Sequence, residues 1–126
     1  MNKQLKKLLM GLFIVIATAS SVLAMNYSEA KQQNKPIVVM FHMHGCGACR
    51  KFSPIFDNYS SKFSEKFNFI KEDIDNSQIA SKLNSLFETV PAIFIIQPKT
   101  EKATRVSDDC AWNKECFTKT LQDYTN

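Results

Sequence analysis

Glycine and proline are scarce in this chain, with only three and four copies among 126 residues. A disordered chain, or a β-rich chain with many tight turns, would use more of both. The sequence also shows no internal repeat, no low-complexity segment and no change of composition that would mark a second domain. The length suits one small domain, and the apolar content, which includes ten phenylalanines, is sufficient for a packed core.

The first 24 residues differ in character from the rest. Three lysines precede an apolar run from Leu8 to Ala17. The segment ends in Val22-Leu23-Ala24, with a side chain of modest size at Val22 and a small one at Ala24. This order predicts a secretory signal peptide at residues 1–24, cleaved after Ala24, and one mature domain at residues 25–126. A membrane anchor is the alternative, but the apolar run is shorter than the ~20 residues that span a bilayer. We therefore expect an exported protein, in a bacterial periplasm, with no stable membrane insertion after cleavage.

Charge is nearly balanced in the predicted mature domain. Three of the 16 basic residues lie in the predicted signal peptide, which has no acidic residue, so a net charge of +1 remains of the original +4. Such a balance gives no reason to expect nucleic acid or an anionic membrane as a partner.

All four cysteines lie in the predicted mature domain, as the pairs Cys46 with Cys49 and Cys110 with Cys116. In an oxidising compartment this even number is compatible with two disulfides. Zinc would need two more ligands beside the first pair, and the spacing of the second pair is unusual for zinc. His42 and His44 lie close to the first pair, so capture of copper or zinc stays an alternative, although we expect no metal.

Apolar patterns predict alternating strands and helices. Continuous apolar runs at 37–41 and 92–96 predict strands buried on both faces. Apolar residues three and four apart predict one helix after Cys46, and another after Ser77 whose stripe reaches Leu86 and Phe87. The other predicted elements are a short helix within 26–35 ended by Pro36, strands at 67–74 and 102–106, and a last helix at 113–124. This order predicts an α/β fold with a central mixed sheet of about four strands flanked by helices.

Three features of the mature part, in this order, resemble the thioredoxin family. They are Cys46-Gly47-Ala48-Cys49 after a strand, Pro54 within the next helix, and Val90-Pro91 before the third strand. The resemblance runs from Ile37 to the C-terminus and implies the thioredoxin-like fold, with a cis peptide bond at Pro91 facing the cysteines. With the signal peptide, the chain is most similar to exported members, the periplasmic thioredoxin-like and Dsb-type proteins.

The activity that the resemblance implies is thiol–disulfide exchange, with no cofactor beyond a redox-active Cys46–Cys49 disulfide. Cys46 is the expected nucleophile, because unpaired N–H groups at a helix N-terminus favour the thiolate. Cys49, almost one helical turn further on, is the expected resolving thiol. The expected substrate-binding residues are those beside the pair and the residues at the cis bond: Gly45, Gly47, Ala48, Val90 and Pro91.

Three positions depart from the usual thioredoxin pattern. Gly45 stands where thioredoxins usually carry tryptophan, Ala48 where they carry proline, and Met40 where many bury an aspartate that assists proton transfer. The direction of exchange and the redox potential are therefore not predicted by the sequence.

The second cysteine pair has two interpretations. A structural disulfide between Cys110 and Cys116 would tie the last loop to the first turns of the last helix, with the ring of Trp112 packed over it. The alternative is a second redox pair that relays electrons or gates the first.

The expected partners are cysteine-containing exported proteins and a soluble or membrane-bound redox donor or acceptor protein. Two other functions stay open: a binding module that holds a partner without turnover, and a metal-handling protein that uses cysteine and histidine.

Overall fold

The computed structural model describes residues 25–125, so the predicted signal peptide lies outside the described residues. The described elements, in chain order, are α2 (Tyr27–Lys31), β1 (Ile37–His42), α3 (Gly47–Phe63), β2 (Asn68–Asp73), α4 (Gln78–Leu83), the 3₁₀ helix η1 (Asn84–Leu86), β3 (Ala92–Ile96), β4 (Ala103–Val106), α5 (Asp108–Trp112) and α6 (Lys114–Tyr124). None of the helices in residues 25–125 has both the length and the apolar character needed to span a membrane.

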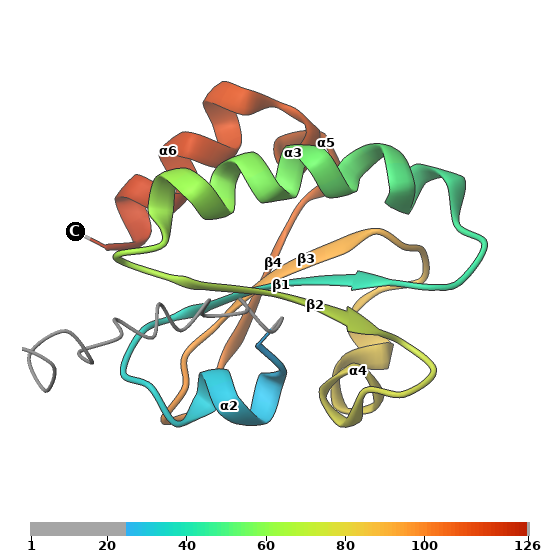
Figure 1. Ribbon diagram of the computed structural model, residues 1–126, viewed down its shortest axis with the longest axis horizontal. Coiled ribbons are helices and arrows are strands. Elements are labelled where there is room, and N and C mark those ends of the chain that lie inside the picture. Colours follow the sequence, from blue (N-terminus) through green and yellow to red (C-terminus); the bar gives the residue numbers. More distant parts are fainter. Residues whose placement is uncertain (1–24, 126) are drawn as a thin grey trace, which may run out of the picture.

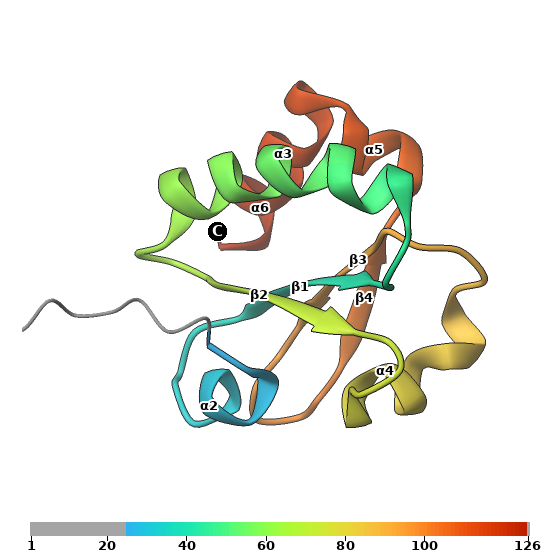
Figure 2. The same cartoon turned by 45° about the vertical axis from the view of Figure 1, so that its right-hand side comes forward.

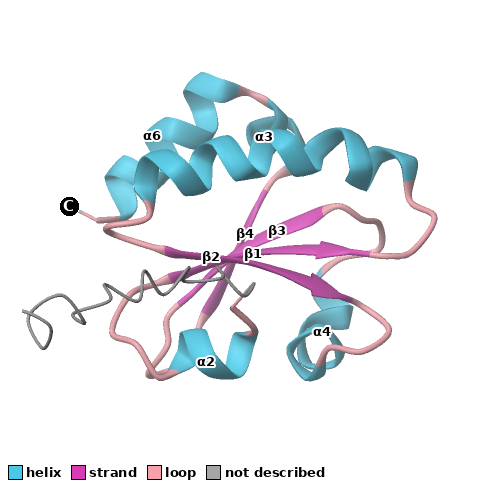
Figure 3. Ribbon diagram, viewed as in Figure 1, coloured by secondary structure: helices cyan, strands magenta, loops and turns pink. Residues whose placement is uncertain are grey.

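The four strands form one mixed sheet in the order β2-β1-β3-β4. β1 and β2 are parallel, as their connection through α3 requires, whereas β3 is antiparallel to both β1 and β4. Helices α3, α5 and α6 cover one face of this sheet, and α2 and α4 lie on the other (Figures 1 and 3). The predicted sheet of four strands between helices is confirmed.

β1 lies inside the sheet, and both of its faces are buried. Val38 and Met40 point into the core beneath α3, while Ile37, Val39 and Phe41 point into the core beneath α2 and α4. This position explains why the strand is apolar at successive residues instead of at alternate ones. It also fixes the end of β1, and with it the loop that carries the first cysteine.

Aromatic rings fill the core between the sheet and α3. Phe52, Phe56 and Tyr59 lie on the buried face of α3. Tyr59 packs edge-on against Phe117 of α6, with ring centroids 4.4 Å apart. These contacts hold α3, whose first turn carries the cysteine pair, in a fixed position over the sheet.

Two helices end earlier than the sequence predicts. α2 ends at Lys31, well before Pro36, so proline is not what ends it. α4 ends at Leu83 and tightens into η1, which turns Leu86 outward until 51% of its surface is exposed. The predicted stripe of α4 was therefore wrong at Leu86.

α5 was missed by the sequence analysis. Ser107 caps it, and Asp108 and Asp109 in its first turn suit a helix N-terminus. The helix is five residues long and buries only Ala111, so no apolar period develops. Only the capping pattern could have revealed it.

The pKa values of all three tyrosines are raised, chiefly by burial. For Tyr27 burial, helped by the charge of Glu101, raises the pKa to about 12 from 10.0. Its hydroxyl is buried without a hydrogen-bond partner among the described residues. The folded state favours the neutral phenol of Tyr27. The contribution of this residue to the free energy of unfolding is therefore complete below pH 10 and is lost as the pH rises towards 12.

We therefore expect the free energy of unfolding to fall between pH 10 and pH 12, and Tyr27→Phe to reduce this fall. Stability at neutral pH should be unchanged or slightly higher in the variant, because the lost hydroxyl has no partner to leave unpaired. Urea denaturation at a series of alkaline pH values measures both effects. An identical alkaline loss in the two proteins would contradict the assignment to Tyr27.

Candidate functional site

Cys46 lies at the start of α3, where the loop after β1 turns into the helix. Gly45 has a φ of 80°, a left-handed conformation that glycine adopts without strain. Cys46 is the N-cap of α3, and its Sγ accepts a hydrogen bond from the Cys49 backbone N–H at 3.0 Å. The first turn of the helix therefore directs an N–H group at this sulfur, an arrangement that stabilises a thiolate.

Cys46 and Cys49 form a disulfide, with their Cα atoms 5.2 Å apart. Cys46 is half-buried, whereas Cys49 belongs to the core beneath α3 and is only 4% exposed. Gly47 and Ala48, between them, are exposed. Cys46 is therefore the more accessible of the two sulfurs.

Val90 and Pro91 lie against the cysteine pair. The carbonyl oxygen of Val90 is 3.7 Å from Cys46 Sγ, although the two residues are 44 positions apart in sequence. The Val90–Pro91 peptide bond is cis. The adjacent strands β1 and β3 are what bring these segments together, because Phe41 near the end of β1 pairs with Ala92 at the start of β3. The backbone of Val90 thus borders the half-buried sulfur of Cys46.

A pocket of about 330 Å³ opens beside the pair, and both cysteines line it. His42, His44 and Arg50 contribute to its wall, as do Lys71 and Asp73 of β2. Within residues 25–125, no three histidine, cysteine, aspartate or glutamate side chains are grouped so that they could hold a metal ion.

Met40 and Lys71 also line this pocket. Met40 is 1% exposed and supplies no titratable group near Cys49. Lys71 donates to Ser53 Oγ at 2.6 Å and pairs with Asp57 Oδ1 at 2.8 Å, so α3 holds its ammonium group. Sequence analysis had not identified this link, because a pair between β2 and α3 leaves no local signal.

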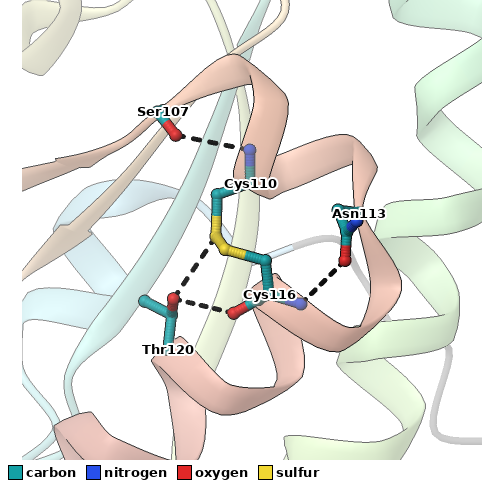
Figure 4. The surroundings of a disulfide bond; sticks show 5 residues. All are labelled: Ser107, Cys110, Asn113, Cys116 and Thr120. Carbon is teal, nitrogen blue, oxygen red and sulfur yellow. Dashed lines mark hydrogen bonds between the residues drawn. A yellow bond between two sulfur atoms is a disulfide. The ribbon is translucent and has the colours of Figure 1, made fainter.

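Cys110 and Cys116 form the second disulfide, which joins α5 to α6 (Figure 4). Each cysteine donates its backbone N–H to the residue that caps its helix: Cys110 to Ser107 and Cys116 to Asn113. Thr120 Oγ1 lies 3.4 Å from Cys110 Sγ and donates to the Cys116 carbonyl. The bridge therefore links two helix N-termini, not a loop and a helix as the sequence analysis expected.

Trp112 packs on α3. Its ring meets Phe52 edge-on, with centroids 4.9 Å apart, and 44% of its surface stays exposed. It lines a pocket with Ile55 and Tyr59 that contains neither Cys46 nor Cys49. The ring thus packs on α3 and does not line the pocket beside the first cysteine pair.

Comparison with known proteins identifies relatives across most of the chain. The family profile described as Thioredoxin matches residues 19–122. The chain is 28% identical to thioredoxin M4, chloroplastic, of Arabidopsis thaliana over 113 residues, covering 85% of this chain and 56% of that protein. It is 32% identical to the thioredoxin of Borreliella burgdorferi over 63 residues, covering 50% of this chain and 53% of that protein. The chain thus spans about half the length of the curated relatives it matches.

Solved structures support the same assignment. The crystal structure of thioredoxin NaTrxh from Nicotiana alata superposes with a TM-score of 0.61 at 26% identity, covering 79% of this chain and 81% of that one. The fold predicted from the sequence is confirmed by this superposition and by the family match.

Proposed function

Because this chain belongs to the thioredoxin family, we propose that it is an exported thiol–disulfide oxidoreductase with Cys46 as nucleophile and Cys49 as resolving thiol. The observation that carries the proposal is the placement of the two sulfurs. Cys46 is accessible at the N-cap of α3, Cys49 is buried behind it, and the two are joined in a disulfide.

In the reductive direction, the Cys46 thiolate attacks one sulfur of a substrate disulfide and forms a mixed disulfide, releasing the other substrate sulfur as a thiolate. The Cys49 thiolate then attacks Cys46 Sγ, which closes the Cys46–Cys49 bond and releases the reduced substrate. The same steps in reverse oxidise a substrate dithiol. In each direction two electrons pass between the pairs, so no further cofactor is needed.

The proposed substrates are cysteine-containing proteins presented as extended chains. The Val90 carbonyl beside Cys46 is placed to accept a hydrogen bond from a substrate backbone N–H. Gly45, Gly47 and Ala48 are exposed and small, so they leave room for that chain above the pair. A redox donor or acceptor protein would regenerate Cys46–Cys49 at the same surface.

Two measurements test the function. Turnover of a peptide with one intramolecular disulfide, supplied with a dithiol reductant, tests exchange by the purified protein. The equilibrium potential of the Cys46–Cys49 couple then decides between a reductant and an oxidant of exported proteins. A protein that neither reduces the peptide disulfide nor oxidises the peptide dithiol would refute the proposal.

The proposed export is tested separately. The full-length chain should yield a mature protein that begins at Met25 and is found outside the cytoplasm, because residues 1–24 have the features of a cleaved signal. Mass spectrometry of the N-terminus and cell fractionation measure this. Recovery of an uncleaved chain in the cytoplasm would refute export without affecting the chemistry.

The absence of an acid at position 40 leads to a prediction about proton transfer. Met40→Asp should speed the step that deprotonates Cys49 by up to about tenfold near neutral pH, because a buried carboxyl has a raised pKa suited to a general base. Met40→Asn is the matched control, since it has similar size and polarity but cannot take the proton. The pH dependence of single-turnover rates measures the effect. The same pH profile in both variants would refute a role for the carboxylate.

A binding module without turnover remains the alternative. It would bind cysteine-containing partners through Val90 and the exposed apolar side chains of Met43, Leu86 and Trp112, while Cys46 stayed unreactive. Binding that is unchanged in Cys46→Ser, together with no exchange by the unaltered protein, would favour it.

A further inference from the structure

The segment from η1 to Val90 has an apolar anchor. Phe87 stacks parallel to Phe41 at 5.1 Å between centroids and meets Phe94 edge-on at 5.7 Å. Leu86, next to it, turns outward, and a hollow of about 290 Å³ lies along residues 85–89 and Arg105. The ring of Phe87 therefore anchors the segment in the core, while the residues before and after Phe87 are less tightly packed.

Arg105 of β4 supplies a polar support for this segment. Its Nη1 donates to the carbonyl oxygen of Leu86 at 3.1 Å, across 19 positions of sequence. Apart from the contact of Cys46 with Val90, no other side-chain hydrogen bond reaches residues 84–90 within the described part of the chain. Arg105 pairs with Phe94 in the sheet, which places it in the half of β4 nearer the cysteines.

The same guanidinium also contacts α5. Nη2 of Arg105 donates to Asp108 Oδ1 at 3.3 Å, and Asp108 begins the helix that the Cys110–Cys116 bridge joins to α6. The planar fork of arginine suits two acceptors in two directions, which the single nitrogen of lysine cannot hold in the same way. Arg105 therefore connects the segment before Pro91 to a helix fixed by a disulfide (Figure 2 shows β4 leading up into α5, and the segment that follows α4 rising to β3).

We propose, on the basis of the function proposed above, that Arg105 is a positioning residue that sets the Leu86–Val90 segment against Cys46, with Asp108 orienting its guanidinium. Val90 follows Leu86 by four residues, and its carbonyl is the group that borders Cys46 Sγ. A loosened segment would present this carbonyl to a substrate backbone less often, while the sulfur itself would keep its surroundings on α3.

Arg105→Ala should raise KM for the peptide disulfide by about three- to tenfold and change kcat little, because it affects substrate placement and not the sulfurs. Arg105→Lys should give a smaller increase, since the ammonium can reach one of the two acceptors. Lys102→Ala is the matched control, because it removes an exposed cation just before β4 begins, away from the half of the strand that holds Arg105. Alkylation of reduced Cys46 by iodoacetamide, which needs no peptide contact, should be unchanged in all three.

A second readout separates this inference from the proposed function. The ¹⁵N order parameters of the backbone amides at residues 86–90 should fall from about 0.85 to below about 0.6 in Arg105→Ala and be unchanged in Lys102→Ala. If the unaltered protein shows no turnover but this difference in order parameters is present, the proposed function fails and the positioning role stands. Equal KM and equal order parameters in Arg105→Ala and the unaltered protein overturn the positioning role.

Asp108→Asn provides the test if Arg105→Ala does not fold. This variant keeps the hydrogen bond from Arg105 to the Leu86 carbonyl and weakens the hydrogen bond from Arg105 to residue 108. Its KM should rise and its order parameters at residues 86–90 should fall, both by less than in Arg105→Ala. Values identical to those of the unaltered protein overturn the role given to Asp108.

Discussion

Cys46→Ser should lower the rate of thiol–disulfide exchange by at least about a thousandfold, because removal of a covalent nucleophile leaves no alternative route for the first step. A serine hydroxyl is not ionised near neutral pH and does not attack a disulfide. The backbone of the helix start should be retained, since serine is also a favourable N-cap residue and can accept the bond from the Cys49 N–H. Measured against the reduced unaltered protein, in which the Cys46–Cys49 bond is also open, the variant should therefore lose activity and keep its stability. Turnover of the peptide disulfide and thermal unfolding of the same sample measure both.

Cys49→Ser distinguishes the roles of the two sulfurs. With Cys46 free and no resolving thiol, the variant should attack the substrate and remain joined to it as a mixed disulfide. Non-reducing electrophoresis and mass spectrometry detect this adduct, which Cys46→Ser should not form. Full exchange by Cys46→Ser would reject Cys46 as nucleophile, and trapping by that variant through Cys49 would reverse the assignment.

Removal of the second disulfide should lower the free energy of unfolding by about 2 kcal/mol, which corresponds to about 10 °C in Tm for a domain of this size. The bridge closes a loop between cysteines six positions apart, so its entropic effect on the unfolded chain is at the low end of the usual range. It also fixes α5, a helix of five residues that would not be stable alone. The double variant Cys110→Ser with Cys116→Ser avoids an unpaired thiol, and urea denaturation measures the loss.

The kcat of the same double variant decides between the two interpretations of the bridge. If the bridge is structural, kcat per folded molecule should be retained, because Cys46 and Cys49 are complete without it. A kcat that falls close to that of Cys46→Ser, with the fold intact, would instead identify a second redox pair.

Sequence analysis predicted the central strands and the start of α3 well because the signals there are local. β1 is apolar from Ile37 to Phe41, as a strand covered on both faces must be, and β3 has the predicted bounds. The Cys-x-x-Cys spacing places two sulfurs one turn apart wherever a helix begins at Gly47. α5 shows the opposite case: its cap and acidic first turn are local signals, but one turn with one buried residue has no period to detect.

The sequence by itself therefore determined the strand and helix segments around the cysteines and the spacing of the pair, because periodicity, capping and spacing act over a few residues. Only the tertiary structure decided that the Val90 carbonyl lies 3.7 Å from Cys46, that α3 holds Lys71, and that Arg105 joins the Leu86 carbonyl to α5. These contacts depend on the order of the strands and on which helices share a face of the sheet. Residues far apart in the chain meet only once the core has packed, and no short stretch of sequence records that meeting.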